Sequence, residues 1–240
     1  MLEKTPGIVL KHVKYSETSI ICKIFTEKFG IRSYIINGVR SSKSRNQIVY
    51  FQPLSLLDLV VYEREGKNVQ RIKESKPAFI FSELPFDIVK SSLAVFMTEI
   101  LDKSLKGEPS NSELFAFLDN TIRFLDQTDA RLVNFPIWFL LELSKFFGFQ
   151  PDSLNYAEGK AFNLKEGNFE PVSDATYQIS LNTSAYFYTF LNSSLETSLN
   201  HSIPRPDRRL VLDNLLRFYA YHMESFGEVQ SLEILKIVLE

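Results

Sequence analysis

The stretch IVLKHVKYSETSIICKIFTEKFGIRSYIINGV, residues 8–39, decides the fold of the first part of the chain. It is rich in β-branched residues, which favour strands. Within it TSIICKIFTE alternates, with Cys22 and Ile24 on one face, and IRSYIINGV resumes the alternation after a glycine, with Arg32 and Tyr34 on one face. A period of two residues is that of a β-strand with one buried face. We therefore predict consecutive short strands here.

Two further strands follow outward from this stretch. LSLLDLVVYERE (54–65) and VQRIKESKP (69–77) are separated by a turn at Gly66 and Lys67. Five short strands with turn residues between them and no long helix indicate a small barrel, and both an SH3-like barrel and an OB-fold fit this pattern.

The period changes after Pro77. Apolar residues recur at helical spacing over 86–106, and a Ser-x-x-Glu capping box at Ser110–Glu113 predicts the start of a second helix. A third helix, apolar nearly all round, should run from about 130 to Gly148 and be buried by its neighbours. We predict an α+β protein with a barrel domain over 1–78 and a helical domain over 79–240. An irregular insertion at 150–182 should contain a hairpin, KAFNLKEGNFEPV, and helices are expected near 183–194, 207–225 and 229–238.

Composition sets the class of the protein. The chain has 240 residues, of which 45% are apolar, and a single cysteine, Cys22, which we read as a small core residue. One thiol makes no internal disulfide, so we expect a reducing, cytoplasmic setting. The N-terminus has no signal-peptide core, and no apolar run approaches the ~20 residues that span a bilayer, so no membrane partner is expected.

Charge is distributed unevenly. Residues 1–76 contain 14 Lys and Arg against 7 Asp and Glu, a net charge of +7, whereas residues 77–240 have a net charge of −9. A basic first segment attracts a polyanion, and the acidic remainder does not. This split indicates two domains with different partners.

Motifs for catalysis are absent from the sequence. There is no GxGxxG, P-loop, HExxH or GxSxG, and the histidines His12, His201 and His222 lack the spacing of metal ligands. A nuclease would need a cluster of metal-binding carboxylates, and the basic segment has only scattered acids. We therefore expect no enzyme activity, no metal and no other cofactor.

The basic segment itself is the candidate site. Its cations should line one groove and neutralise phosphates, with Tyr15, Tyr34 or Phe51 offering faces for bases. The competing interpretation is of scattered surface lysines that keep the domain soluble. A stronger indication of phosphate binding is the segment INGVRSSKSRNQIVYFQP (36–53). Its Gly38 permits a close backbone approach, and its serines can donate hydrogen bonds to phosphate oxygens. The predicted DNA-binding residues are Lys11, Lys14, Arg32, Tyr34, Arg40, Lys43, Ser44, Arg45, Arg64 and Lys67.

The order of these residues resembles the N-terminal domain of the RecO family of bacterial recombination mediators and DNA-repair proteins. The strong match covers about 75 residues; FFGFQP at 146–151 and RRLVLDNLLRFYAYHM at 208–223 agree more weakly. The matching landmarks are Glu17-Thr18, Phe25-Thr26, Gly30, Gly38-x-Arg40, Ser44 and Gln52-Pro53.

The resemblance implies a fold and a function. The fold is an OB-fold followed by a helical domain. The function is to bind single- and double-stranded DNA, anneal complementary strands and assist recombinase loading on strands coated by single-strand-binding protein. The implied partners are RecR and the C-terminal tail of single-strand-binding protein, and the implied location is bacterial cytoplasm, at the nucleoid during repair.

An alternative is an interaction adaptor whose domains dock repair proteins with little direct DNA binding. In that case Phe-rich helix surfaces would take an apolar peptide, and an arginine such as Arg123 or Arg131 would bind its acidic tail.

One departure from the family concerns metal. Many members carry a four-cysteine zinc module after the element that matches GFQP, and LNYAEGKAFNLKEGNFEP at this position has no cysteine. The hairpin should instead be held by packing of Phe162, Leu164 and Phe169.

Overall fold

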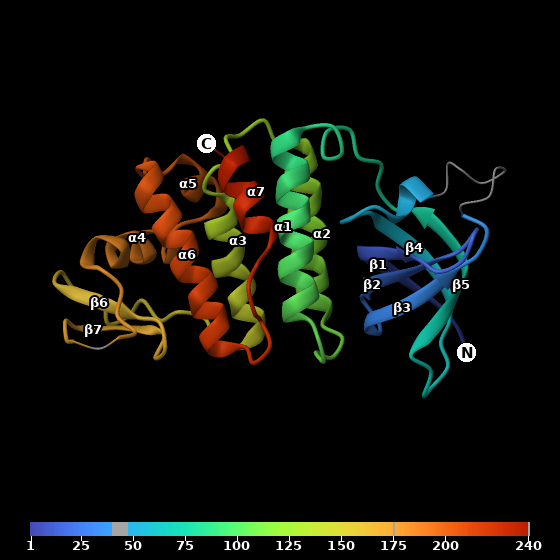
Figure 1. Cartoon of the computed structure of the whole chain (residues 1–240), viewed down its shortest axis with the longest axis horizontal. Helices are drawn as coiled ribbons and strands as arrows, with labels where there is room; N and C mark the ends of the chain where they lie inside the picture. The colour runs from blue at the N-terminus through green and yellow to red at the C-terminus, as the bar shows by residue number, and fades with distance from the viewer. Residues whose placement is uncertain (40–47, 175, 240) are drawn as a thin grey trace. The chain divides into compact units, whose positions relative to one another are not determined.

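Five strands close a barrel at the N-terminal end of the chain in the computed structural model of the protein (Figure 1). The structure describes residues 1–39, 48–174 and 176–239. The strand order is β1-β2-β3-β5-β4, with β3 and β5 parallel and all other neighbours antiparallel. The prediction of an OB-fold barrel is confirmed, and closure leaves no unpaired edge. The strands are β1 (Leu2–Lys14), β2 (Ile20–Thr26), β3 (Gly30–Ile36), β4 (Leu56–Tyr62) and β5 (Val69–Pro77).

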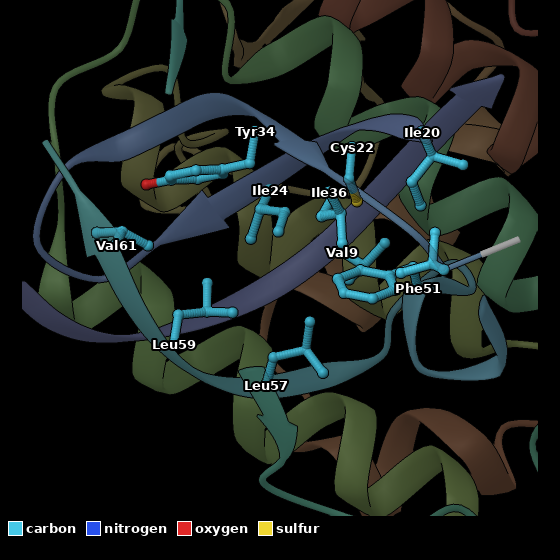
Figure 2. Close-up of a cluster of buried hydrophobic side chains, with 11 residues drawn as sticks. Val9, Ile20, Cys22, Ile24, Tyr34, Ile36, Phe51, Leu57, Leu59 and Val61 are labelled. Carbon is cyan, nitrogen blue, oxygen red and sulfur yellow. The ribbon is translucent and has the colours of Figure 1, made fainter. Parts of the chain in front are cut away.

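The barrel is filled by side chains from one face of each strand. Tyr34 is fully buried in this core (Figure 2). Cys22 is buried beside it as a small apolar side chain, as predicted, and burial raises the pKa of its thiol. The core cluster comprises Val9, Ile20, Cys22, Ile24, Tyr34, Ile36, Val39, Phe51, Leu57, Leu59 and Val61, where Phe51 belongs to the short 3₁₀ helix η1 (Ile48–Phe51).

Two helices complete the first of two compact units, Met1–Thr128. They are α1 (Ile88–Ser104) and α2 (Ser112–Gln127). Phe25 on the outside of β2 packs on Phe115 of α2, with ring centroids 5.9 Å apart. The predicted capping box at Ser110 is wrong, because Asn111 is the N-cap and its side chain accepts from the backbone N–H of Leu114. Asparagine caps a helix as well as serine does.

The second unit, Asp129–Glu240, is mostly helical. Its central helix, α3, is buried at nine of its ten residues, as its uniform apolarity predicts, and Gly148 ends the following turn with φ of +75°. The helices are α3 (Phe135–Ser144), η2 (Lys145–Phe147), α4 (Leu181–Leu191), α5 (Leu195–Asn200), α6 (Arg205–His222) and α7 (Ser231–Val238).

The predicted hairpin forms from β6 (Lys160–Asn163) and β7 (Asn168–Pro171). Phe162, Leu164 and Phe169 are all buried, and the rings of Phe162 and Phe169 meet edge to face at 5.0 Å. The predicted packing of these three residues is confirmed.

The domain limits at 78 and 79 remain a prediction. The last barrel strand does end at Pro77, whereas the two compact units meet between Thr128 and Asp129, so the first unit includes two helices. Within the described residues, every helix is too short or too polar to cross a lipid bilayer.

Candidate nucleic-acid interface

The loop between β4 and β5 brings together three of the predicted DNA-binding residues. Arg64 and Lys67 lie on this loop, and Arg32 reaches the same place from β3. All three line an open cavity of about 570 Å³, together with the carboxylates of Glu63 and Glu65. Three cations against two carboxylates leave a small excess of positive charge, which can attract the phosphates of a nucleic-acid backbone.

Gln70 fixes the shape of this loop from beneath. Its side chain is 3% exposed. The amide oxygen accepts the backbone N–H of Arg64 at 3.1 Å, and the amide nitrogen donates to the carbonyl oxygens of Arg64 at 2.6 Å and Lys67 at 3.2 Å. The two loop cations are therefore attached to a backbone that is held in one conformation.

A carboxylate orients the third cation. Arg32 Nε donates to Glu63 Oε1 at 3.0 Å, and Glu63 follows Tyr62 at the end of β4. The second oxygen, Oε2, is buried without a hydrogen-bond partner among the described residues. Glu63 thus aims the guanidinium of Arg32 and reduces the positive charge of the cavity.

Two of the aromatic side chains predicted to stack on bases are instead in the core. Tyr34 is 0% exposed, and burial together with the negative charge of Glu63 raises the pKa of its phenol. Phe51 is 1% exposed. The prediction that Tyr34 binds DNA is wrong, because its side chain points into the barrel core and no base can reach its ring. Tyr15, exposed between β1 and β2, retains an accessible ring.

Lys11 lies on a different surface, together with Lys23. Both ammonium groups bind the carboxylate of Asp102 on α1, Lys11 at 2.5 Å from Oδ2 and Lys23 at Oδ1. Burial alone would raise the pKa of Asp102, but the hydrogen bonds and charges of the two lysines outweigh it and lower that pKa. Lys11 is thus engaged in attaching a helix to the barrel and is not gathered with the loop cations.

One further predicted residue, Lys14, does not line this cavity. Lys14 is exposed at the end of β1, opposite Ile20 in the strand register. The predictions at Arg40, Lys43, Ser44 and Arg45 lie outside the described residues.

Sequence reasoning missed a row of residues on the outer surface of the sheet. Ile35 of β3 pairs with Arg71 of β5, Arg71 pairs with Tyr62 of β4, and Tyr62 pairs with Leu2 of β1. Tyr62 is 40% exposed. The alternation of LLDLVVY already places Tyr62 on the other face of the strand from the buried Val61. The cross-strand neighbours of Tyr62 depend on a register that the sequence does not show.

The second unit has a separate group of arginines. Arg205, Arg208 and Arg209 of α6 and Lys236 of α7 line a small cleft of about 20 Å³ whose remaining lining is apolar, including Ile137. Burial, followed by the positive charges of Arg131, Arg205 and Arg209, lowers the pKa of Arg208. Lys236 is engaged by Asp213 at 2.9 Å and by Glu233 at 3.3 Å, so part of the positive charge of this cleft is balanced. Arg123, the other candidate, is engaged by Asp119 on its own helix at 2.7 and 3.2 Å.

The histidines serve the structure. Nδ1 of His12 lies 2.8 Å from the carbonyl oxygen of Phe51, Nε2 of His201 lies 2.7 Å from Ser193 Oγ, and Nε2 of His222 lies 3.1 Å from the carbonyl oxygen of Leu164. Across residues 1–39, 48–174 and 176–239, no three His, Cys, Asp or Glu side chains gather in a way that could hold a metal ion.

A closed five-stranded barrel followed along the chain by helices defines an OB-fold protein with a helical C-terminal region. Two family models agree with this class: "Recombination protein O N terminal" matches residues 1–81, and "Recombination protein O C terminal" matches residues 85–228. The chain belongs to the RecO family of DNA repair and recombination proteins.

Individual relatives match over nearly the whole chain. The DNA repair protein RecO of Flavobacterium psychrophilum is 35% identical over 236 residues, and that of Phocaeicola vulgatus is 35% identical over 239 residues, with 98% of both chains covered in each case. A shorter match, 32% identical over 151 residues, covers 63% of this chain and 58% of the RecO protein of Chlorobium limicola.

A zinc module does not fit this chain. The region 150–182 has no cysteine, so no thiolate is present to bind zinc. The interior of the hairpin is filled by the rings of Phe162 and Phe169, and Tyr156 stacks on Tyr188 of α4 at 3.9 Å. Aromatic packing therefore holds this hairpin together.

Proposed function

We propose that the chain is a DNA repair and recombination mediator that binds single- and double-stranded DNA. It anneals complementary strands and assists the loading of recombinase on strands coated by single-strand-binding protein. The observation that carries this proposal is the gathering of Arg32, Arg64 and Lys67 around one open cavity of a closed barrel. Family membership supports the same role.

Annealing follows from phosphate binding. Two complementary strands repel each other through their backbones, and cations that bind phosphates reduce this repulsion while they hold the strands near one another. Because the loop cations contact the backbone and not the base edges, binding should be independent of sequence.

The test is the salt dependence of DNA binding by a double variant, Arg64→Glu with Lys67→Glu. We expect weaker binding to every sequence, and a log–log salt slope that is smaller by about 1.4, since each phosphate contact on a single strand contributes about 0.7. Fluorescence anisotropy at several salt concentrations measures both quantities.

A matched control changes the same amount of charge on the same barrel. Lys73→Glu with Lys76→Glu reverses two β5 lysines that already lie near carboxylates, Lys73 beside Glu74 at 3.6 Å and Lys76 beside Asp58 at 3.3 Å. The control should leave the slope closer to that of the wild type. Equal losses in both double variants would mean that only net charge matters and would contradict a site at the loop.

The arginine cleft of the second unit supports binding of the C-terminal tail of single-strand-binding protein, if that tail is acidic and ends in an apolar residue. Arg208 and its neighbours would bind the carboxylates of the tail, and its terminal apolar side chain would lie against apolar residues at the surface of the cleft, which is too small to enclose it. Titration calorimetry with a synthetic acidic peptide of this kind should show about tenfold weaker binding to Arg208→Gln, whereas Arg123→Gln should bind as the wild type does. RecR is the further partner that we propose, from the family alone.

A further inference from the structure

The outer surface of the barrel presents an aromatic ring in the middle of a cross-strand row. Tyr62 lies on the face of β4 opposite the buried Val61 and is 40% exposed. In the strand register Tyr62 is flanked by Arg71 on one side and by Leu2, which is 47% exposed, on the other. Residues paired in this way have Cβ atoms about 5 Å apart, so they form a continuous strip across neighbouring strands.

Arg71 is available for an external partner. Its side chain is exposed, and within the described part of the chain its guanidinium has no hydrogen bond or ion pair. Other cations of the barrel surface do have carboxylate partners, as Lys28 has Glu3 and Lys76 has Asp58. An uncompensated guanidinium next to an exposed aromatic ring is suited to a ligand with an anion and a flat apolar group close together.

The row is continuous with the loop cations. Tyr62 is the last residue of β4 and Arg64 follows two residues later, while Val69, 39% exposed, begins β5 two residues before Arg71. A nucleic-acid strand whose phosphates lie on Arg64 and Lys67 therefore has Tyr62 and Arg71 next along the surface of the sheet.

We propose that Tyr62 stacks on an unpaired base while Arg71 binds a neighbouring phosphate, so that this face prefers single-stranded DNA to duplex. The inference rests on the proposed function and adds its strand preference. A ring that stands on a sheet can stack only on a base whose face is free, and in a duplex both faces of each internal base are covered by its neighbours. The loop cations, which contact phosphates, make no such distinction.

The experiment compares three labelled probes of equal length by fluorescence anisotropy: oligo-dT, an abasic strand with the same backbone, and a duplex. The wild type should bind oligo-dT about tenfold more tightly than the abasic strand, the effect of stacking a single base. Tyr62→Leu should lose about that factor on oligo-dT and keep its affinity for the abasic strand and the duplex. Tyr62→Phe, which retains the ring, should bind all three probes as the wild type does.

Two further variants complete the test. Arg71→Gln should weaken binding to oligo-dT and to the abasic strand by the same factor, since a phosphate is present in both. Tyr221→Leu changes a tyrosine of similar exposure, 44%, on α6 and should have no effect.

The outcomes separate the inference from the function on which it rests. If the wild type binds oligo-dT and the abasic strand equally, the stacking role of Tyr62 is refuted and the proposed DNA-binding function stands; this comparison needs no variant to fold. If Tyr62→Leu weakens all three probes alike, Tyr62 acts through the structure of the barrel and not through a base. If no probe binds to the wild type, the proposed function itself fails. If Leu2, Val69 and Tyr62 instead bind a protein partner, oligonucleotides will not displace that partner, and this result would also overturn the inference.

Discussion

Gln70 holds the loop between β4 and β5 in its conformation. Its buried amide makes three hydrogen bonds to the loop backbone. Replacement by leucine keeps the size of the side chain but removes every donor and acceptor. We expect Gln70→Leu to lower the free energy of unfolding by about 1–3 kcal/mol, the cost of leaving buried polar groups unpaired, and to weaken DNA binding as Arg64 and Lys67 lose their fixed positions.

Urea denaturation and oligonucleotide binding measure the two effects of this change. Gln52→Leu is the matched control, since Gln52 is exposed and, among the described residues, its amide makes one long contact, 3.4 Å, with the carbonyl oxygen of Ile48. A Gln70→Leu variant with unchanged DNA affinity would show that the loop does not need to be held in advance.

Gly30 is constrained both by its backbone and by its neighbours. Its φ is +63°, and a Cβ atom there would lie 3.3 Å from the backbone nitrogen of Ser110 and 3.4 Å from the carbonyl oxygen of Glu108. Gly30→Ala should therefore lower the free energy of unfolding by roughly 1–2 kcal/mol, because an L residue is strained in the left-handed region, and by a further amount because the Cβ atom crowds its neighbours. Gly66→Ala is the control, because Gly66 has φ of +74° with open space around it. Thermal denaturation of the two variants should show the larger loss for Gly30→Ala.

At the scale of single residues, periodicity predicted burial better than it predicted partners. The alternation that placed Arg32 and Tyr34 on one face was correct, but it did not show that this face points inward, so Tyr34 was expected at the surface. Lys11 was expected on a DNA groove because nothing in the sequence links it to Asp102, which lies 91 residues later.

Among elements, the segment between the barrel and α1 is held by one carboxylate. Asp126 of α2 is 1% exposed and accepts the backbone N–H groups of Ser82, Glu83 and Leu84 at 2.8 to 3.1 Å. The ammonium group of Lys90 donates to the backbone carbonyl of the same residue at 2.9 Å. The chain that leaves β5 is thus fastened to α2 before α1 begins.

Asp126→Asn should destabilise the first unit by about 2–3 kcal/mol, because the amide nitrogen of asparagine faces backbone donors and accepts nothing from them. Asp119→Asn is the control on the same helix; Asp119 binds only the partly exposed Arg123, so its change should cost under about 1 kcal/mol. Urea denaturation compares the two. Similar losses in both variants would contradict the role given to Asp126.

Asp126 also predicts a dependence of stability on pH. Burial would raise its pKa, but the hydrogen bonds from Leu84, Glu83 and Ser82 outweigh burial and lower it below the ordinary value of 3.8. The stabilisation is therefore fully present above pH 3.8 and is lost as pH falls through the lower folded pKa. Melting temperatures of the wild type should fall below pH 4, and Asp126→Asn should show a smaller fall over the same range; parallel curves would refute this assignment.

Elements with strong local signals could be predicted, and those set by tertiary contacts could not. The last barrel strand, 69–77, and the hairpin near 160–172 have the predicted limits, since turn residues bound them on both sides. The short helices η1 and α5 have no period of their own, because four to six residues are too few to show one. The N-cap of α2 was predicted at Ser110, one residue before the observed cap Asn111, because several neighbouring polar residues there can all cap a helix.

On the scale of the whole molecule, the first unit is larger than the barrel. Phe25 is buried against Phe115, and Lys11 and Lys23 bind Asp102, so a fragment that ends at residue 78 loses the partners of all three. We expect a fragment of residues 1–128 to unfold more cooperatively and at a higher temperature than a fragment of residues 1–78. Circular dichroism during heating tests this, and equal midpoints would place the stable unit at the barrel alone.

The general architecture was accessible from the sequence because two signals agreed. The change of period after Pro77 separated strands from helices, and the net charge of +7 over residues 1–76 indicated the part that we propose to bind a polyanion. The location of the cavity was not accessible, since it depends on the parallel pairing of β3 with β5 across the closure of the barrel. That pairing brings β3, which carries Arg32, beside the start of β5 and the loop that carries Arg64.

The aromatic hairpin of the second unit has a consequence for the conditions under which the protein keeps its shape. With Phe162 and Phe169 in its interior and no thiolate in the region, folding there depends on the removal of rings from water. Chelators should leave its melting temperature unchanged, and oxidants that strip zinc from thiolate sites have nothing to attack in this region. A cell short of trace metals would still assemble this part of the molecule in full.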